Sequence, residues 1–182
     1  LTRVDLPNSL EKIGRYAFGK CASITEMLLP FVGCKKNPSS ASAETTFSSI
    51  WDSDSFTNAI YVSQYFNADG KEAHRNSACI SSKLKKVTVK GGKLYYGAFY
   101  NCSMLTEIEI QSGVTYIDEA VFYGCSSLTT LTLPYLGSSS SSTEANFAKE
   151  FKTLSDVPET LTTVRISGGT LLDGAFENCS GI

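Results

Sequence analysis

A phrase of 21 to 23 residues recurs along the chain, and this self-similarity constrains the fold more strongly than any other feature of the sequence. The fullest copies read LTRVDLPNSLEKIGRYAFGKCAS and LTEIEIQSGVTYIDEAVFYGCSS, with leucine, isoleucine, phenylalanine and cysteine at shared positions. Two copies lose two residues at a Gly-Gly pair, and two more keep only the first ten positions. The six copies begin at Leu1, Ile24, Leu84, Leu105, Leu128 and Leu161.

The start of the phrase alternates apolar and polar residues, which is typical of a half-buried strand. A proline or glycine, such as Pro7, is expected to end each strand. One coil cannot bury its own apolar face, so the coils should stack with parallel strands about 4.8 Å apart. The spacing predicts a right-handed solenoid with a sheet on one face. Inside it, we expect a buried, stacked column of the repeat phenylalanines Phe18, Phe99, Phe122 and Phe176.

The lines GAFYNCSMLTEIEI and VFYGCSSLTTLTLP resemble the BspA-type leucine-rich repeat of bacterial and protist surface proteins. The resemblance covers the chain apart from two insertions and is specific, because four near-full copies recur in register. It implies one domain over residues 1–182, an α/β but strand-dominated leucine-rich-repeat solenoid of about six coils. It also implies an extracellular or cell-surface protein with an adhesive or receptor-like role, without identifying a ligand.

Two insertions interrupt the array, over residues 34–83 and 137–160, and they look related. Both contain the pattern E-x-x-F-x-x-x-[WF], which places Phe47 with Trp51 and Phe147 with Phe151. Aromatic residues four apart lie on one face of a helical turn. We therefore expect each pair to belong to a short helix that packs the insertion onto the solenoid, the second one capped by Ser142 or Thr143.

The first insertion also contains Ala59–Phe66 followed by the turn signal Asn67–Gly70, which together suggest a β-hairpin. This is the least repeat-like part of the chain, and variable elements on a rigid scaffold often bind partners. Tyr61 and Tyr65 are the candidate contact residues in it. The alternative is a loop that merely covers the convex side of the solenoid.

Six cysteines fall into two groups. Four share one repeat position and are expected to be small buried thiols: Cys21, Cys102, Cys125 and Cys179. Cys34 and Cys79 bracket the first insertion, and no repeat position accounts for them. The extracellular setting implied by the resemblance would permit a disulfide between them. The alternative is two free thiols.

The sequence offers no catalytic set, cofactor motif or metal site, and we expect no enzymatic activity. His74 is the one histidine and lies in a polar stretch, which leaves most metal and acid–base sites without their usual residue. A net charge of −2 argues against nucleic acid as a partner. No apolar run is long enough to insert in a bilayer. Asn101 and Asn178 match glycosylation sequons, but both follow from the repeat phrase.

The polar strand positions should form two columns on the exposed face of the sheet. The third position of each copy reads Arg3, Glu26, Lys86, Glu107, Thr130 and Thr163. The fifth reads Asp5, Leu28, Thr88, Glu109, Thr132 and Arg165. Arg3 with Glu26, and Lys86 with Glu107, should pair across neighbouring strands. The candidate partner-binding residues on this face are Lys86, Glu107, Glu109, Thr130, Thr132 and Arg165. The alternative is a solvated sheet surface rich in good strand formers.

These observations favour a non-catalytic, adhesin-like binding module that recognises a protein or glycan of a host or neighbouring cell. Two other functions remain open: a structural spacer, and a carbohydrate-binding accessory region of a larger secreted protein. The chain starts without methionine and inside a repeat, so we expect it to be a piece of a longer protein. Cut repeat ends would then favour self-association.

Overall fold

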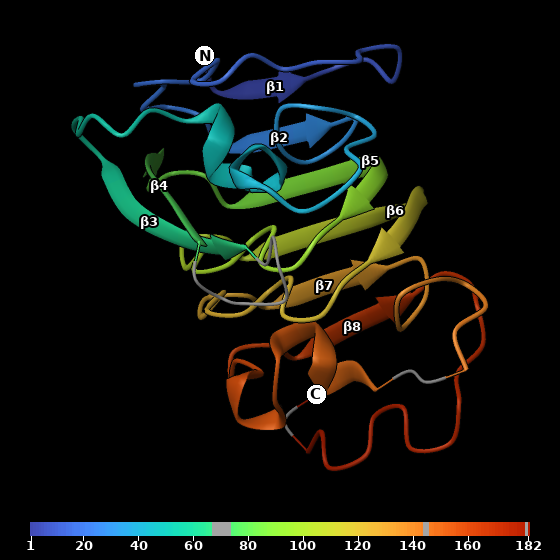
Figure 1. The fold of residues 1–182 in the computed structure, drawn as a ribbon. Helices are drawn as coiled ribbons and strands as arrows, with labels where there is room; N and C mark the ends of the chain where they lie inside the picture. Colours follow the sequence, from blue (N-terminus) through green and yellow to red (C-terminus); the bar gives the residue numbers. More distant parts are fainter. Residues whose placement is uncertain (67–73, 144–145, 181) are drawn as a thin grey trace.

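The computed structural model describes residues 1–66, 74–143, 146–180 and 182, and a six-stranded parallel sheet runs through them (Figure 1). Neighbours in this sheet follow the order β1-β2-β5-β6-β7-β8, while β3 and β4 form a separate antiparallel pair. The strands are β1 (Arg3–Asp5), β2 (Glu26–Leu29), β3 (Ala59–Phe66), β4 (His74–Ser81), β5 (Lys86–Leu94), β6 (Glu107–Ile117), β7 (Thr130–Leu133) and β8 (Thr163–Ile166). The short helices are η1 (Ala43–Thr45), η2 (Phe47–Ile50), η3 (Phe147–Phe151) and η4 (Leu154–Asp156).

Strands from neighbouring copies of the repeat pair in the register that the alignment predicts. Glu26 lies opposite Lys86, Lys86 opposite Glu107, and Glu107 opposite Thr130. The alternate positions point inward, and in the four central strands these side chains are fully buried: Met27, Val87, Ile108 and Leu131. A stack of coils with a shared apolar core follows, which agrees with the expected repeat solenoid.

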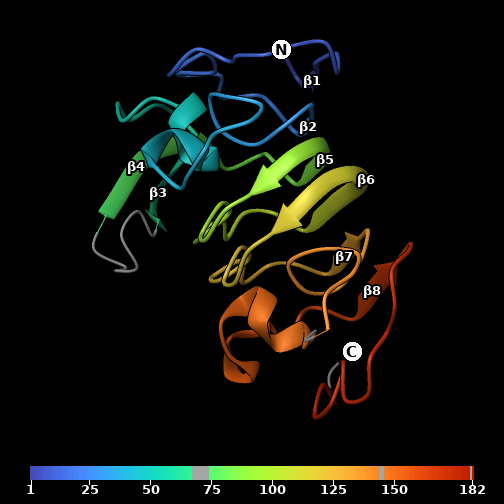
Figure 2. The same cartoon turned by 45° about the vertical axis from the view of Figure 1, so that its right-hand side comes forward.

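The Gly-Gly pair does not end β5, contrary to the expectation that glycine terminates each strand. Pairing between β5 and β6 continues past Gly91 and Gly92, with register shifts on either side of the pair. Gly91 lies opposite Gly113. A Cβ added to Gly113 would come within 2.2 Å of the carbonyl oxygen of Lys90. Glycine thus permits a close backbone approach, and both strands curve where the sheet turns (Figure 2).

The repeat phenylalanines do not stack directly on one another along the whole array, as had been expected. Aromatic residues of the two insertions stand between them in a continuous series with ring centroids 5.1 to 6.2 Å apart. Its order is Phe18, Trp51, Phe47, Phe99, Phe122, Phe151, Phe147 and Phe176. Each insertion therefore supplies the aromatic layer that the truncated copy before it lacks.

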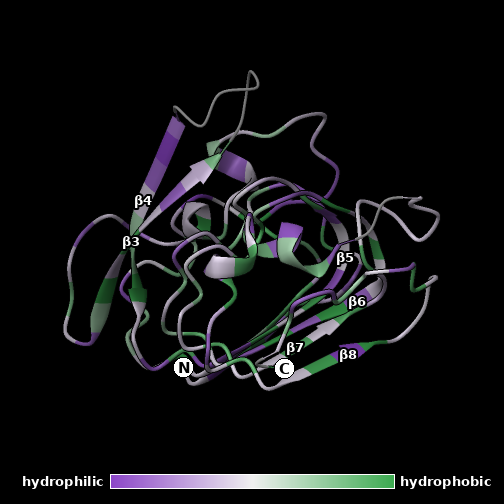
Figure 3. Cartoon of the chain, turned by 90° about the horizontal axis from the view of Figure 1, so that it is seen from below, coloured by the Kyte–Doolittle hydropathy of each residue, from purple (hydrophilic) through white to green (hydrophobic). Residues whose placement is uncertain are grey.

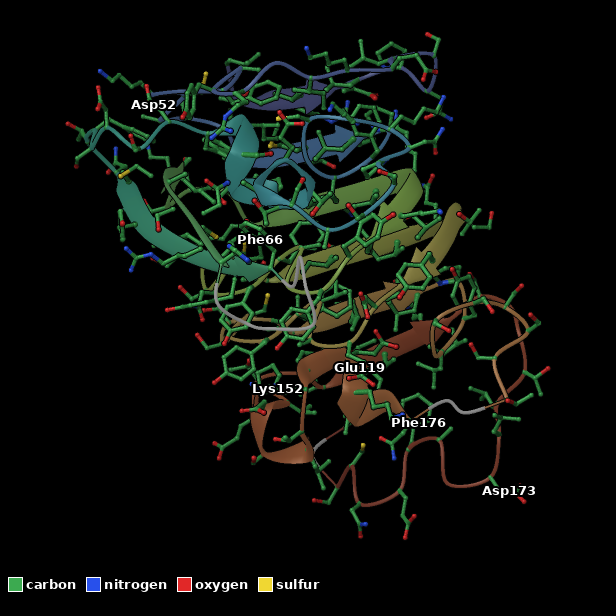
Figure 4. The ribbon with its side chains drawn as sticks, in the orientation of Figure 1. Asp52, Phe66, Glu119, Lys152, Asp173 and Phe176 are labelled. Carbon is green, nitrogen blue, oxygen red and sulfur yellow. The ribbon has the colours of Figure 1, made fainter. Side chains whose placement is uncertain are left out.

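One detail of that expectation was wrong, because Phe176, in the last coil that the structure describes, is only partly buried (Figure 4). The predicted short helix is present in each insertion, as the 3₁₀ helices η2, which Trp51 directly follows, and η3. No α-helix occurs in the described parts of the chain. The side chain of Asn146, rather than Ser142 or Thr143, accepts the capping hydrogen bond of η3 from the Ala148 amide.

The predicted hairpin is present, with β3 and β4 paired from Ala59 opposite Ser81 to Phe66 opposite His74. The turn predicted at 67–70 lies outside the described residues. Viewed along the stack, the hairpin stands apart from strands β5 to β8, with the short helices between them (Figure 3). The sheet face and the hairpin are therefore two separate surfaces.

Candidate functional site

The outward face of the six-stranded sheet holds its charged side chains in pairs across neighbouring strands. Arg3 Nε lies 2.9 Å from Glu26 Oε2, and Lys86 Nζ lies 2.7 Å from Glu107 Oε1, so both predicted ion pairs are confirmed. The hydrogen bond to Glu107 raises the pKa of Lys86, against the opposing effect of burial. Partly exposed pairs of this kind contribute less than about 1 kcal/mol each, so they fix side-chain positions more than they stabilise the fold.

The second column is joined by hydrogen bonds instead of ion pairs. Thr88 donates to one oxygen of Glu109 at 3.4 Å, and Gln111 donates to the other at 3.0 Å. Asp5 faces Leu28 in its own column and pairs instead with Lys90 Nζ, 2.6 Å away in the middle of β5. The hydrogen bond from Lys90 holds the pKa of Asp5 below its usual value.

The character of this face changes along the sheet. The β5 and β6 strands present charged groups, while β7 and β8 present partly exposed Thr130, Thr132 and Thr163. Arg165 lies opposite Thr132 and is exposed. The structure brings six candidate partner-binding residues together on this face: Lys86, Glu107, Glu109, Thr130, Thr132 and Arg165.

The other two candidates, Tyr61 and Tyr65, lie on the hairpin and not on the sheet. Tyr61 is 61% exposed. Tyr65 is half-buried, and its ring packs against Tyr100 at an interplanar angle of 59°, with the centroids 5.2 Å apart. Tyr61 is therefore available to a partner, while Tyr65 contributes mainly to the docking of the hairpin.

Polar residues that the sequence reasoning missed hold the hairpin against the solenoid. Gln64 is fully buried, accepts from the Ser48 amide at 2.6 Å and donates to the Ala98 carbonyl at 3.2 Å. Asn76 donates to Thr46 Oγ1 at 2.9 Å and to Ser48 Oγ at 3.0 Å. Gln64 lies two residues after Val62 and two before Phe66, so alternation along the strand places it on the same inward face as these apolar residues. This position was the signal in the sequence that Gln64 is buried.

The predicted disulfide between Cys34 and Cys79 is absent, and both are buried free thiols. The Cys34 thiol lies 3.3 Å from Ser49 Oγ, in the polar interior beside the short helices. The Cys79 thiol belongs to β4 and donates to the Ser53 carbonyl at 3.5 Å. The two cysteines bracket the insertion in sequence, but each side chain has its own partner in a different place.

The cysteines at the shared repeat position behave largely as expected. Cys102 and Cys125 in the central coils are buried, while Cys21 and Cys179 near the ends are half-buried. Burial raises the pKa of Cys125 to about 12 and that of Cys102 well above its usual value. The central thiols therefore remain protonated and unsuited to nucleophilic chemistry.

His74 does not assemble an acid–base site. It is exposed at the start of β4, with its ring stacked on Phe66 at 5.4 Å between centroids. Within the described ranges, no three side chains of the metal-binding types are grouped to hold an ion. The same ranges contain no helix long and apolar enough to cross a membrane. Asn101 of the first sequon donates from its side chain to the Ser63 carbonyl at 3.1 Å, so its amide is engaged in the hairpin contact.

Besides the sheet face and the hairpin, the structure contains a hollow beside Glu150 that was not anticipated from the sequence. Glu150 in η3 is 2% exposed and borders a hollow of about 470 Å³ between the end of β6 and the start of the second insertion. The available signal was the duplicated insertion itself, because the pattern that aligns Phe147 with Phe47 places Glu150 at the position of the apolar Ile50.

Comparison with known proteins gives one match. The family model for the BspA type leucine rich repeat region matches residues 1–93 and 70–182, in six copies. No curated protein and no solved structure matches the chain. The family match covers the array from end to end and agrees with the strand register described above.

Proposed function

The chain belongs to the BspA-type leucine-rich-repeat family, and on that premise we propose that it is a non-catalytic, adhesin-like binding module of a surface or secreted protein. Proteins of this family are generally non-enzymatic, commonly bind other proteins and are typically found outside the cell or on its surface. The proposed ligand is a protein of a host or neighbouring cell, either on its surface or in the matrix around it.

The outward sheet face is the proposed contact surface, and its fixed side-chain array is the observation that carries the proposal. Its charges are held by cross-strand bonds, from the pair of Lys86 and Glu107 to the contact of Thr88 with Glu109. A partner that meets such a face does not have to order it, so less conformational entropy is lost on binding. The neighbouring threonines offer hydroxyl groups that both donate and accept.

Tyr61 on the docked hairpin offers a second contact. Tyrosine is enriched where proteins meet, since it provides a large rigid surface and a polar end. The hairpin is anchored by the buried Gln64, so Tyr61 is presented by a held element and not by a loose loop.

The experiment is a binding assay of the chain against immobilised extracellular-matrix proteins, with variants of each surface. Thr132→Arg places a long cation in the middle of the sheet face, beside Glu109, and should weaken capture at least about tenfold. Thr57→Arg adds the same side chain at an exposed position outside both surfaces and should leave capture unchanged. Tyr61→Ala tests the hairpin.

Thermal unfolding of each variant shows whether the fold is retained. If Thr132→Arg and Tyr61→Ala are folded and bind as well as the original chain, neither surface makes the contact and the proposal is wrong. A chain that captures none of the proteins in the panel would favour the structural spacer over the binding module.

A further inference from the structure

A polar hollow lies between two elements that are distant in sequence. Its volume is about 470 Å³, within the range of small-molecule sites. One side is the end of β6 and the turn after it, with Tyr116 and Asp118, and the other is the start of the second insertion, with Ser139, Ser142 and the η3 residues Lys149 and Glu150. Glu119 of the first side lies close to the turns of the insertion (Figure 4). None of these residues belongs to the two columns of the sheet face.

Glu150 lines this hollow, and only one of its two carboxyl oxygens has a hydrogen-bond partner among the described residues. Oε1 accepts from the Gly137 amide at 3.3 Å. Oε2 is buried and has no hydrogen-bond partner among the described residues, a condition it shares only with Trp51 Nε1. A buried carboxyl oxygen without a partner destabilises the fold, so its retention requires an explanation.

The fold itself does not explain it, because the first insertion builds the same layer without a carboxyl group. Ile50 occupies the equivalent position and is fully buried. The backbone roles also match: the Ile50 carbonyl accepts from the Phe18 amide at 2.9 Å, and the Glu150 carbonyl accepts from the Phe122 amide at 3.0 Å. An apolar residue therefore satisfies this position, and glutamate adds something other than packing.

We propose that the hollow binds a small uncharged saccharide, with the Glu150 carboxyl group as the buried anchor that hydrogen-bonds a sugar hydroxyl. The chemistry of the lining matches such a ligand. Serine hydroxyls are grouped at one wall, where Ser142 Oγ accepts from the Ser139 amide at 2.9 Å and lies 3.3 Å from Ser138 Oγ. Hydroxyl groups donate and accept, as those of a sugar do. Tyr116 adds a half-exposed ring to the wall.

The remaining charged groups make a cation a poorer fit. Both Asp118 oxygens already accept backbone hydrogen bonds, from Tyr96 and Glu119 at 3.2 and 2.9 Å. Glu119 itself is paired with Lys149 at 3.8 Å, and Lys149 brings a positive charge to the hollow. Two of the three carboxylates are thus engaged, which leaves Glu150 as the group with capacity for a ligand.

The protonation of Glu150 also favours a neutral sugar over a cation. Burial is the main cause that raises its pKa to about 8, and Asp118 and Glu119 add to the effect while the Gly137 amide opposes it. Lys149 and Tyr116 are the other ionisable groups that line the hollow, and Tyr135 lies near enough to interact electrostatically with Glu150. At neutral pH the carboxyl group is mostly protonated and donates a hydrogen bond, which a sugar oxygen accepts and an ammonium group cannot.

The test is a titration of the isotopically labelled chain with a panel of mono- and disaccharides, with calcium chloride and free lysine as separate arms. Binding is followed by NMR at the amides of Gly137 and Ser139. We expect at least one neutral sugar to shift these signals in a saturable way, and neither cation to do so.

Two variants test whether Glu150 binds the sugar directly. Glu150→Ile introduces the residue of the first insertion and should abolish saturable binding, while its thermal unfolding temperature is unchanged or higher. Glu150→Gln keeps a donor and an acceptor without charge and should bind within about threefold of the original chain. Glu159→Gln removes an exposed acid elsewhere and should change nothing.

The pH dependence completes the test. Sugar affinity should be level between pH 5 and 7 and fall above pH 8, as Glu150 loses its proton. Affinity that rises with pH and is lost in Glu150→Gln would instead identify a cation site and overturn the proposal. It is also overturned if no sugar shifts Gly137 or if Glu150→Ile binds sugar normally. The sheet-face variant Thr132→Arg should bind sugar normally, so this result is separate from that of the proposed function.

Discussion

At the scale of single residues, Glu150 makes stability depend on pH. Its pKa rises from an ordinary value near 4.5 to about 8 on folding, so the folded chain holds a proton that the unfolded chain releases between these values. The contribution of Glu150 to stability should therefore be fully present below about pH 4.5, where both states are protonated, and fall as pH rises toward 8.

Urea unfolding at pH 5, 6.5 and 8 measures this slope. The Glu150→Gln variant cannot titrate at this position and should show a flatter dependence, so the difference between the two curves isolates one group. Parallel curves for the original chain and the variant would mean that Glu150 ionises normally in the folded state.

Phe122 lies inside the aromatic series. It is fully buried, with Phe99 at 6.2 Å on one side and Phe151 at 5.9 Å on the other. Phe122→Ala should lower the free energy of unfolding by about 3–5 kcal/mol, because a cavity opens between two coils. Phe176→Ala is the matched comparison. It should cost about 1–2 kcal/mol, since that ring is only partly buried. Equal losses measured by urea denaturation would contradict this packing.

Residue positions were predictable from the sequence only where the repeat fixes them. The pair of Lys86 and Glu107 follows from register alone, and the structure confirms it. Cys34 and Cys79 belong to no repeat position, so their proximity in sequence to the ends of an insertion said nothing about where their side chains point. Glu150 was missed for a related reason, because its burial depends on a neighbouring coil.

At the scale of elements, the hairpin depends on Gln64. Gln64→Ala would leave the buried Ser48 amide without its acceptor, which costs about 1–3 kcal/mol. The loss should appear locally, as faster hydrogen exchange in β3 and β4, while β6 and β7 keep their protection. Gln111→Ala is the control, since that side chain is exposed and bonds to Glu109 on the sheet face, away from the hairpin. Uniform loss of protection along the whole chain would show that the hairpin is not a separate unit.

The strands and short helices were predicted more completely from the sequence than the way they pack together. Alternation identified the strands and the hairpin, and aromatic spacing identified the short helices of both insertions. The expected column of repeat phenylalanines was nevertheless incomplete. Two aromatic rings from each insertion lie between the phenylalanines of neighbouring repeats. The repeat pattern could not predict this, because the insertions are not part of the repeat.

At the scale of the whole molecule, the insertions connect the coils into one structure. In a solenoid each coil contacts only its neighbours, so a break at one layer separates the parts on either side. The double variant Phe147→Ala with Phe151→Ala removes the layer between Phe122 and the last coil. Calorimetry should then show a second, lower-temperature transition.

Hydrogen exchange assigns that transition, which should involve residues 161–179 and leave β1 to β6 protected. Leu154→Ala, at an exposed position of η4, serves as the control and should unfold in one step. A single transition shifted as a whole to lower temperature would mean that the last coil is held mainly by its strand pairing.

The aromatic pairs also have a consequence for how such a chain can change over generations. Phe47 with Trp51, and Phe147 with Phe151, restore contact to the coils on both sides, so the later strands keep their register whatever precedes each pair. Gains and losses of residues in the serine-rich stretches before them are therefore tolerated, as they would not be inside a repeat. Descendants of one gene can acquire different exposed segments at these two points while they inherit the same stacked core.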